Sequence, residues 1–79
     1  MPEITLPRLH PEMQSAVIIE WLKREGDVVQ KGEPILVVED EKTTFEVEAP
    51  SSGVLSRILV SIGTDAPVDH PIALIQERT

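Results

Sequence analysis

The chain of 79 residues contains no cysteine and no tyrosine, and Phe45 and Trp21 are its only large aromatic side chains. Without cysteine there is no disulfide bond, no thiolate metal site and no cysteine nucleophile. With so few aromatic rings, the core has to be built from Val, Ile and Leu, which favour β-structure. A chain of this length buries only about 60% of its unfolded surface, which leaves little room for a deep catalytic cleft. We expect one domain over residues 1–79.

Basic side chains are also scarce, since 7 Lys and Arg stand against 14 Asp and Glu, a net charge of −7. This charge argues against nucleic acid or an anionic membrane as a partner. No apolar run approaches membrane-spanning length. The two histidines, His10 and His70, lack acidic neighbours at ligand spacing, so we predict no metal site. Ser51 and Ser52 stand in "PSSG" and not in a nucleophile elbow, so we predict no catalytic residue.

The apolar residues that are present fall in short runs bounded by Gly, Pro, Asp and Ser, without the 3.6-residue period of a helix. This pattern predicts strands near Glu3–Leu6, Ala16–Leu22, Pro34–Glu39, Thr43–Ala49, Val54–Val60 and Pro71–Gln76. Shorter extended pieces are expected at Val28–Val29 and around Val68. The segment "PRLHPEM" (7–13) contains two prolines and is predicted to be a surface loop.

An internal repeat becomes visible when the sequence is shifted by 37 residues. The matching pairs are Val17 and Val54, Leu22 and Leu59, Gly26 and Gly63, Pro34 and Pro71, and Ile35 and Ile72. Gly and Pro matches are informative because these residues mark turns and strand starts. Two such halves predict an all-β fold, a flattened barrel or sandwich of two four-stranded antiparallel sheets with pseudo-twofold symmetry.

The repeat also indicates where Lys42 lies. Lys42 corresponds to Thr79 at the chain end, so a twofold axis places it at the opposite end of the domain from the termini. After Lys42 the residues alternate, and we expect Phe45, Val47 and Ala49 to face the core and Thr44, Glu46 and Glu48 to face water. Between the two strands we expect a type I-like turn centred on Glu41 and Lys42.

Lys42 is preceded by three acids, Glu39, Asp40 and Glu41. Catalytic lysines are activated by desolvation or by a neighbouring cation, whereas these carboxylates stabilise the charged ammonium. Lys42 should therefore be a poor nucleophile by itself. The pattern favours a modification site, at which another enzyme positions and deprotonates the amine, over a catalytic residue.

The chain resembles a lipoyl domain of the acyltransferase (E2) component of a 2-oxo acid dehydrogenase complex. That family's pattern around its modified lysine is Glu-Thr-Asp-Lys-Ala, then Glu-Val and Gly-Val. Here it corresponds to Glu39-Asp40-Glu41-Lys42-Thr43, then Glu46-Val47, "APSSG" and Val54. The similarity extends over nearly the whole chain, including Leu6-Pro7, Met13, Ile18, Trp21, "EGD" (25–27), Gly32, Gly63 and Pro71-Ile72.

The resemblance implies that Lys42 carries lipoic acid in amide linkage and that the domain is a carrier, not an enzyme. Its implied partners are a thiamine-dependent decarboxylase (E1), the E2 catalytic domain, the flavoprotein E3 and a lipoate-protein ligase. For recognition by the ligase or E1 it implies Glu39, Asp40, Glu41 and Thr43 in the hairpin, with Arg8, Leu9, His10 and Glu12 in the loop. We expect a monomer in the bacterial cytoplasm or, alternatively, the mitochondrial matrix.

The sequence departs from this pattern in several places. Glu41-Lys42-Thr43 replaces Asp-Lys-Ala. Asp69 stands where Gly is common and matches Gly32 in the first half. Asp tolerates left-handed backbone better than most residues.

Two alternatives stay open, a biotinyl carrier and an unmodified adaptor domain of the same fold. Biotin sites typically have Met on both sides of the lysine, and such adaptors usually lack the lysine. The lipoylated glycine-cleavage carrier is a longer chain.

Overall fold

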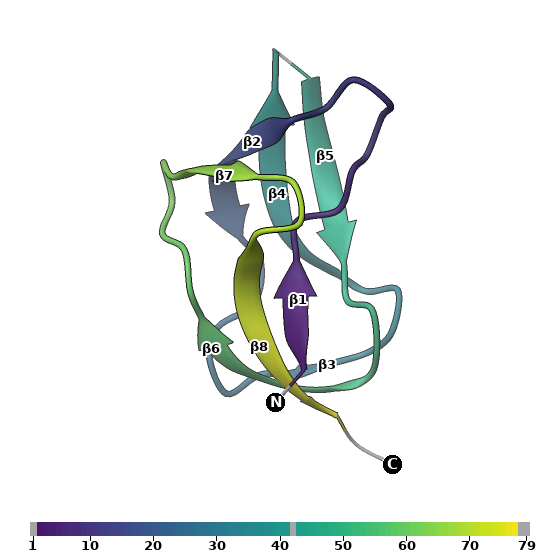
Figure 1. Cartoon of the computed structure of the whole chain (residues 1–79). Helices are drawn as coiled ribbons and strands as arrows, with labels where there is room; N and C mark the ends of the chain where they lie inside the picture. Colours follow the sequence, from purple (N-terminus) through teal and green to yellow (C-terminus); the bar gives the residue numbers. More distant parts are fainter. Residues whose placement is uncertain (1, 42, 78–79) are drawn as a thin grey trace.

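Eight β-strands form the regular structure of residues 2–41 and 43–77, which are the residues that the computed structural model describes (Figure 1). They are β1 (Glu3–Thr5), β2 (Ser15–Trp21), β3 (Val28–Val29), β4 (Pro34–Asp40), β5 (Thr43–Glu48), β6 (Gly53–Ile58), β7 (Asp65–Pro67) and β8 (Pro71–Glu77). The piece expected around Val68 lies slightly earlier, in β7. These residues include no helix, and hence none that could span a membrane.

The strands form two sheets that lie face to face. One sheet has the order β1-β8-β6-β3 and the other β5-β4-β2-β7. All neighbouring strands are antiparallel. The layers make a flattened sandwich of 36 × 22 × 18 Å, in which the sheets do not close into a barrel (Figure 1). The predicted all-β class is confirmed in its sandwich form.

The core between the sheets is aliphatic, as the scarcity of aromatic residues predicts. No polar or charged side chain among the described residues is buried. Burial of each large aliphatic side chain contributes about 1.5–3 kcal/mol, so Ile35, Leu36 and Val38 make β4 a central element. Trp21 is only half-buried, packs against this core and donates its indole N–H to the carbonyl oxygen of Val60 at 3.1 Å.

The internal repeat is visible in three dimensions. A shift of 37 residues carries β2 onto β6, β3 onto β7 and β4 onto β8, and each strand occupies the same place in its sheet as its counterpart. The connections between the sheets repeat as well. Gly26 donates its N–H to the carbonyl of Leu55 at 2.7 Å, and Gly63 donates to Ile18 at 2.8 Å. The predicted pseudo-twofold symmetry is therefore confirmed in strand order and in hydrogen bonding.

One pair of turns differs between the halves in residue type but not in conformation. Gly32 has a φ of 86°, and its counterpart Asp69 has a φ of 71°. Gly32 donates its N–H to the carbonyl of Ala49 at 2.9 Å, and Asp69 donates to the carbonyl of Leu6 at 2.8 Å. Both turns therefore direct the strand after them along an equivalent path. Asp69 therefore preserves the turn by adopting the left-handed backbone, which Asp tolerates better than most residues.

Asp69 provides a test of this turn. Asp69→Val should lower the free energy of unfolding by about 2 kcal/mol, because a β-branched residue fits the left-handed region poorly. Asp69→Gly should stay within about 1 kcal/mol of wild type, because glycine adopts this φ without a steric penalty. Urea unfolding of both variants measures the difference. Equal midpoints for the two variants would show that the backbone conformation does not limit the choice of residue here.

The symmetry fails in one place, the segment between β1 and β2, which we call the β1–β2 loop (residues 6–14). Leu6 and Ala49 are equivalent, because they accept the corresponding bonds from Asp69 and Gly32, and Ala16 and Gly53 are equivalent by the repeat. The first pair is separated by 43 residues and the second by 37. The segment from Leu6 to Ala16 is therefore six residues longer than its counterpart in the other half. The loop extends toward the β4–β5 connection, at the opposite end of the sandwich from the start of β1 and the end of β8 (Figure 1). The scaffold is thus asymmetric beside the hairpin.

Candidate functional site

The β4–β5 hairpin has a two-residue connection. Asp40 pairs with Thr43 across the hairpin, which leaves residues 41 and 42 between the strands. Lys42 itself lies outside the described residues. Glu41 has a φ of 46°, whereas the corresponding position of a type I turn has a φ near −60°. The expected type I-like turn is therefore wrong. Two-residue hairpin loops favour the mirror-image turns, because their twist matches that of the flanking strands.

The strand after the turn has the predicted faces. Val47 and Ala49 are buried and Phe45 packs partly against the core, while Thr44, Glu46 and Glu48 are exposed. The inward residues hold β5 in place. Glu41 and Thr43, the described neighbours of position 42, are both exposed. A group attached at the tip of this hairpin would therefore extend into solvent.

The β1–β2 loop is fixed at both of its ends to the turn between β7 and β8. Leu6 donates its N–H to the carbonyl of His70 at 3.0 Å, and Val68 donates to the carbonyl of Gln14 at 2.9 Å. Met13 is buried in the core, so the loop is also anchored from within. The loop therefore has a defined path across this end of the molecule.

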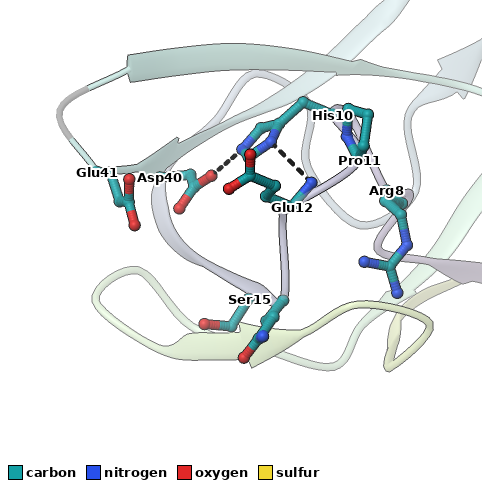
Figure 2. Close-up of a pocket in the computed structure, with 8 residues that line it drawn as sticks. Arg8, His10, Pro11, Glu12, Ser15, Asp40 and Glu41 are labelled. Atoms are coloured by element: carbon teal, nitrogen blue, oxygen red, sulfur yellow. Dashed lines mark hydrogen bonds and ion pairs between the residues drawn. The ribbon is translucent and has the colours of Figure 1, made fainter.

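His10 connects the loop to the hairpin (Figure 2). Its Nε2 forms a hydrogen bond with the carboxylate of Asp40. Its ring lies 6.1 Å from that of Phe45, measured between centroids, at an interplanar angle of 34°. The N–H of Glu12 donates to His10 Nδ1 at 3.3 Å. Because Nδ1 accepts this bond, the hydrogen on Nε2 is the one donated to Asp40.

An open groove of about 820 Å³ lies between the loop and the hairpin tip. It is lined by Arg8, His10, Pro11, Glu12, Gln14, Ser15, Asp40 and Glu41 (Figure 2). Of the predicted recognition residues, Leu9 instead packs against the core, and Glu39 and Thr43 are exposed outside the groove. Pro11, Gln14 and Ser15 were missed, although Pro11 and Gln14 lie in the β1–β2 loop and Ser15 directly follows it.

Metal ligation has no support in the described part of the chain, where no three His, Asp or Glu side chains gather in a suitable arrangement. The groove carries charges of both signs. Arg8 donates through Nη1 to the carbonyl of Met13, which ties this cation to the loop backbone. The groove therefore offers surface contacts but no enclosed ligand cage.

A separate ion pair joins Lys23 and Glu33, with 2.9 Å between Nζ and Oε2. The hydrogen bond to Glu33 raises the pKa of Lys23 above its usual value. The hydrogen bond from Lys23, with a second from the N–H of Gln30, lowers the pKa of Glu33 below its usual value. Lys23 is therefore held in its charged form by an acid that lies outside the hairpin.

Residues 2–75 match the family model described as biotin-requiring enzyme, which covers biotin and lipoyl attachment domains. The chain belongs to the biotin/lipoyl attachment family. The two-sheet sandwich and the lysine hairpin at the end away from the chain ends agree with this membership. The family includes both lipoyl and biotinyl carriers, so membership alone leaves the attached group open.

Relatives of this family member occur in 2-oxo acid dehydrogenase complexes. It is 43% identical over 75 residues to the chloroplastic dihydrolipoyllysine-residue acetyltransferase component 5 of the pyruvate dehydrogenase complex of Arabidopsis thaliana, covering 95% of this chain. It is 40% identical over 74 residues to the pyruvate dehydrogenase E1 component subunit beta of Rhizobium meliloti, covering 92% of this chain. The chain spans only 16% of the length of each relative.

A solved structure supports the fold independently. The lipoyl domain of the 2-oxoglutarate dehydrogenase complex from Azotobacter vinelandii superimposes with a TM-score of 0.76, over 98% of both chains. The sequence identity is 23%, so this similarity shows a shared fold. The fold that was expected from the resemblance to lipoyl domains is the one observed.

Proposed function

We propose that this chain is a lipoyl carrier domain in which the ε-amine of Lys42 bears lipoic acid. The observation that carries the proposal is the β4–β5 hairpin, whose Asp40–Thr43 pairing leaves Glu41 and Lys42 as the connection at one end of the sandwich. A carrier needs its reactive arm to project from a rigid base, and a hairpin anchored by a buried Val47 provides one. The identity of 40–43% to components of pyruvate dehydrogenase complexes favours lipoate over biotin.

The residues present fit a covalently attached group. Glu41 and Thr43 are exposed, so nothing at these two positions closes over an arm on Lys42. Neither neighbour is methionine, which distinguishes the site from the Met-Lys-Met pattern of biotinyl domains. When attached, lipoic acid supplies a dithiolane that accepts electrons together with an acyl group. The chain itself positions the arm, contributes recognition surface and catalyses no step.

The partners that follow from this proposal are an E1 decarboxylase, an E2 catalytic domain, an E3 flavoprotein and a lipoate-protein ligase. The groove residues Arg8, His10 and Glu12, with Asp40 and Glu41, lie together beside the attachment position. They are therefore the surface that a partner would contact while it handles the arm. The corresponding location is the bacterial cytoplasm or the mitochondrial matrix.

Intact-mass measurement tests the proposal. We expect that incubation with lipoate-protein ligase, ATP and lipoate adds one lipoyl group per chain, because the exposed hairpin presents a single lysine. A parallel incubation with biotin ligase and biotin should add nothing. A biotin adduct would support the biotinyl alternative instead, and the absence of both adducts would favour the unmodified adaptor.

A further inference from the structure

His10 contacts both strands of the β4–β5 hairpin. Its Nε2–H donates to Asp40, the last residue of β4 (Figure 2). Its ring also lies against that of Phe45 in β5. The side chain of Asp40 is only 14% exposed, so this bond is partly shielded from water. Hydrogen bonds to charged groups are stronger than neutral ones, and shielding from solvent strengthens them further.

The hairpin tip needs such support because Glu41 is in the left-handed region. A φ of 46° is unfavourable for a residue with a Cβ atom, and such conformations persist only where neighbouring contacts hold them. Asp40 directly precedes Glu41, so a fixed Asp40 carboxylate limits how the turn can relax. The contact that fixes it comes from His10.

His10 is itself well anchored. Its carbonyl accepts from the N–H of Met13 at 3.1 Å, and the N–H of Leu9 contacts the Met13 sulfur at 3.3 Å. Met13 is buried, so these bonds connect His10 to the core. The loop can therefore transmit the rigidity of the sandwich to the hairpin tip.

We propose that His10 is a positioning residue for modification at Lys42, which acts by holding Asp40 and thereby the turn in the conformation that the ligase recognises. This inference rests on the proposed function. Asp40 stands where the lipoyl motif quoted above has Thr, so the His10–Asp40 pair is a feature of this chain and not of that motif. The β1–β2 loop and the hairpin tip then form one recognition surface.

Attachment kinetics test the proposal. His10→Ala and Asp40→Asn should each lower the kcat/KM of lipoyl transfer by about tenfold, the effect expected from losing one hydrogen bond to a charged partner. The double variant should be no slower than the worse single variant, because both changes remove the same contact. His10→Gln, which retains an N–H donor, should recover part of the rate.

Two matched variants control for loss of a histidine and loss of a carboxylate. His70→Gln changes the other histidine, in the turn before β8, and Glu33→Gln changes the acid paired with Lys23. Both should be modified at the wild-type rate. Additive losses in the double variant, or wild-type rates in His10→Ala and Asp40→Asn, would overturn the proposal.

Amide hydrogen exchange provides a readout that does not depend on the ligase. His10→Ala should accelerate exchange at the amides of Thr43 and Thr44. These two residues of β5 pair with Asp40 and Glu39 of β4 beside the hairpin tip. Faster exchange with unchanged kcat/KM would mean that His10 has a structural role only, which overturns its positioning role. If wild type accepts no lipoyl group, the proposed function fails, and exchange still decides whether His10 holds the hairpin.

Discussion

Replacing Lys42 with alanine is expected to abolish lipoyl attachment while leaving the domain as stable as wild type. The amine is the group that forms the amide bond, so no attachment can occur without it. Lys42→Arg should be equally inactive, because the guanidinium is not deprotonated in proteins. This second variant retains the positive charge. Loss of attachment in both variants would therefore be due to the missing amine and not to the changed charge of the acidic hairpin.

The other lysines provide matched controls for this experiment. Lys23 is bound to Glu33, which raises its pKa, and the backbone N–H of Lys31 donates to the hydroxyl of Ser52 at 3.0 Å. Lys23→Ala and Lys31→Ala should be modified at the wild-type rate. Intact mass after ligase treatment measures attachment in all four variants. A lipoyl adduct on Lys42→Ala would place the site elsewhere and contradict the assignment.

Thermal unfolding of Lys42→Ala gives the second half of the expected result. We expect Lys42 to be exposed, as its neighbours Glu41 and Thr43 are. Substitutions at exposed positions usually change the free energy of unfolding by less than about 0.5 kcal/mol. The flanking strands are held by their own pairing, which begins at Asp40 and Thr43. A large drop in the melting temperature would instead mean that Lys42 stabilises the fold, and its role as an attachment site would need separate evidence.

Much of this fold could be predicted from the sequence because the repeat constrains it twice. Pro34 and Pro71 start equivalent strands, and Gly26 and Gly63 make equivalent connections. The irregular registers were not predictable. Strand pairing shifts around Ile19 in β2, and it shifts again around its counterpart in β6. Such bulges depend on how strands pack together and have no simple sequence signal.

The candidate site was predicted less completely. His10 and Asp40 were both expected to contribute to recognition, but as separate members of a loop and a hairpin. Their hydrogen bond joins residues that are 30 positions apart. The bond depends on the path of the β1–β2 loop, which is set by Met13 in the core and by contacts with the turn between β7 and β8. Local sequence patterns carry no information on such contacts.

The largest effect on stability is expected at Gly53, at the start of β6. A Cβ atom there would lie 2.2 Å from the carbonyl oxygen of Gln76 and 2.9 Å from the Cα of Glu77. Both atoms belong to the backbone of β8, the central partner of β6, so they cannot move away as a flexible side chain would. Gly53 does not have a positive φ, so its backbone conformation does not require glycine. Glycine is required because a side chain would not fit.

Gly53→Ala should therefore lower the free energy of unfolding by about 3 kcal/mol, as expected for overpacking against a rigid neighbour. For a domain of this size, that corresponds to a fall in melting temperature of roughly 15 °C. The matched control is Ala16→Gly at the equivalent position of β2, where a methyl group is already accommodated opposite Ala66. This change should cost about 1–2 kcal/mol, through backbone entropy and the loss of one buried methyl group. Calorimetry of both variants measures the difference, and equal melting temperatures would mean that β8 yields to the added methyl group.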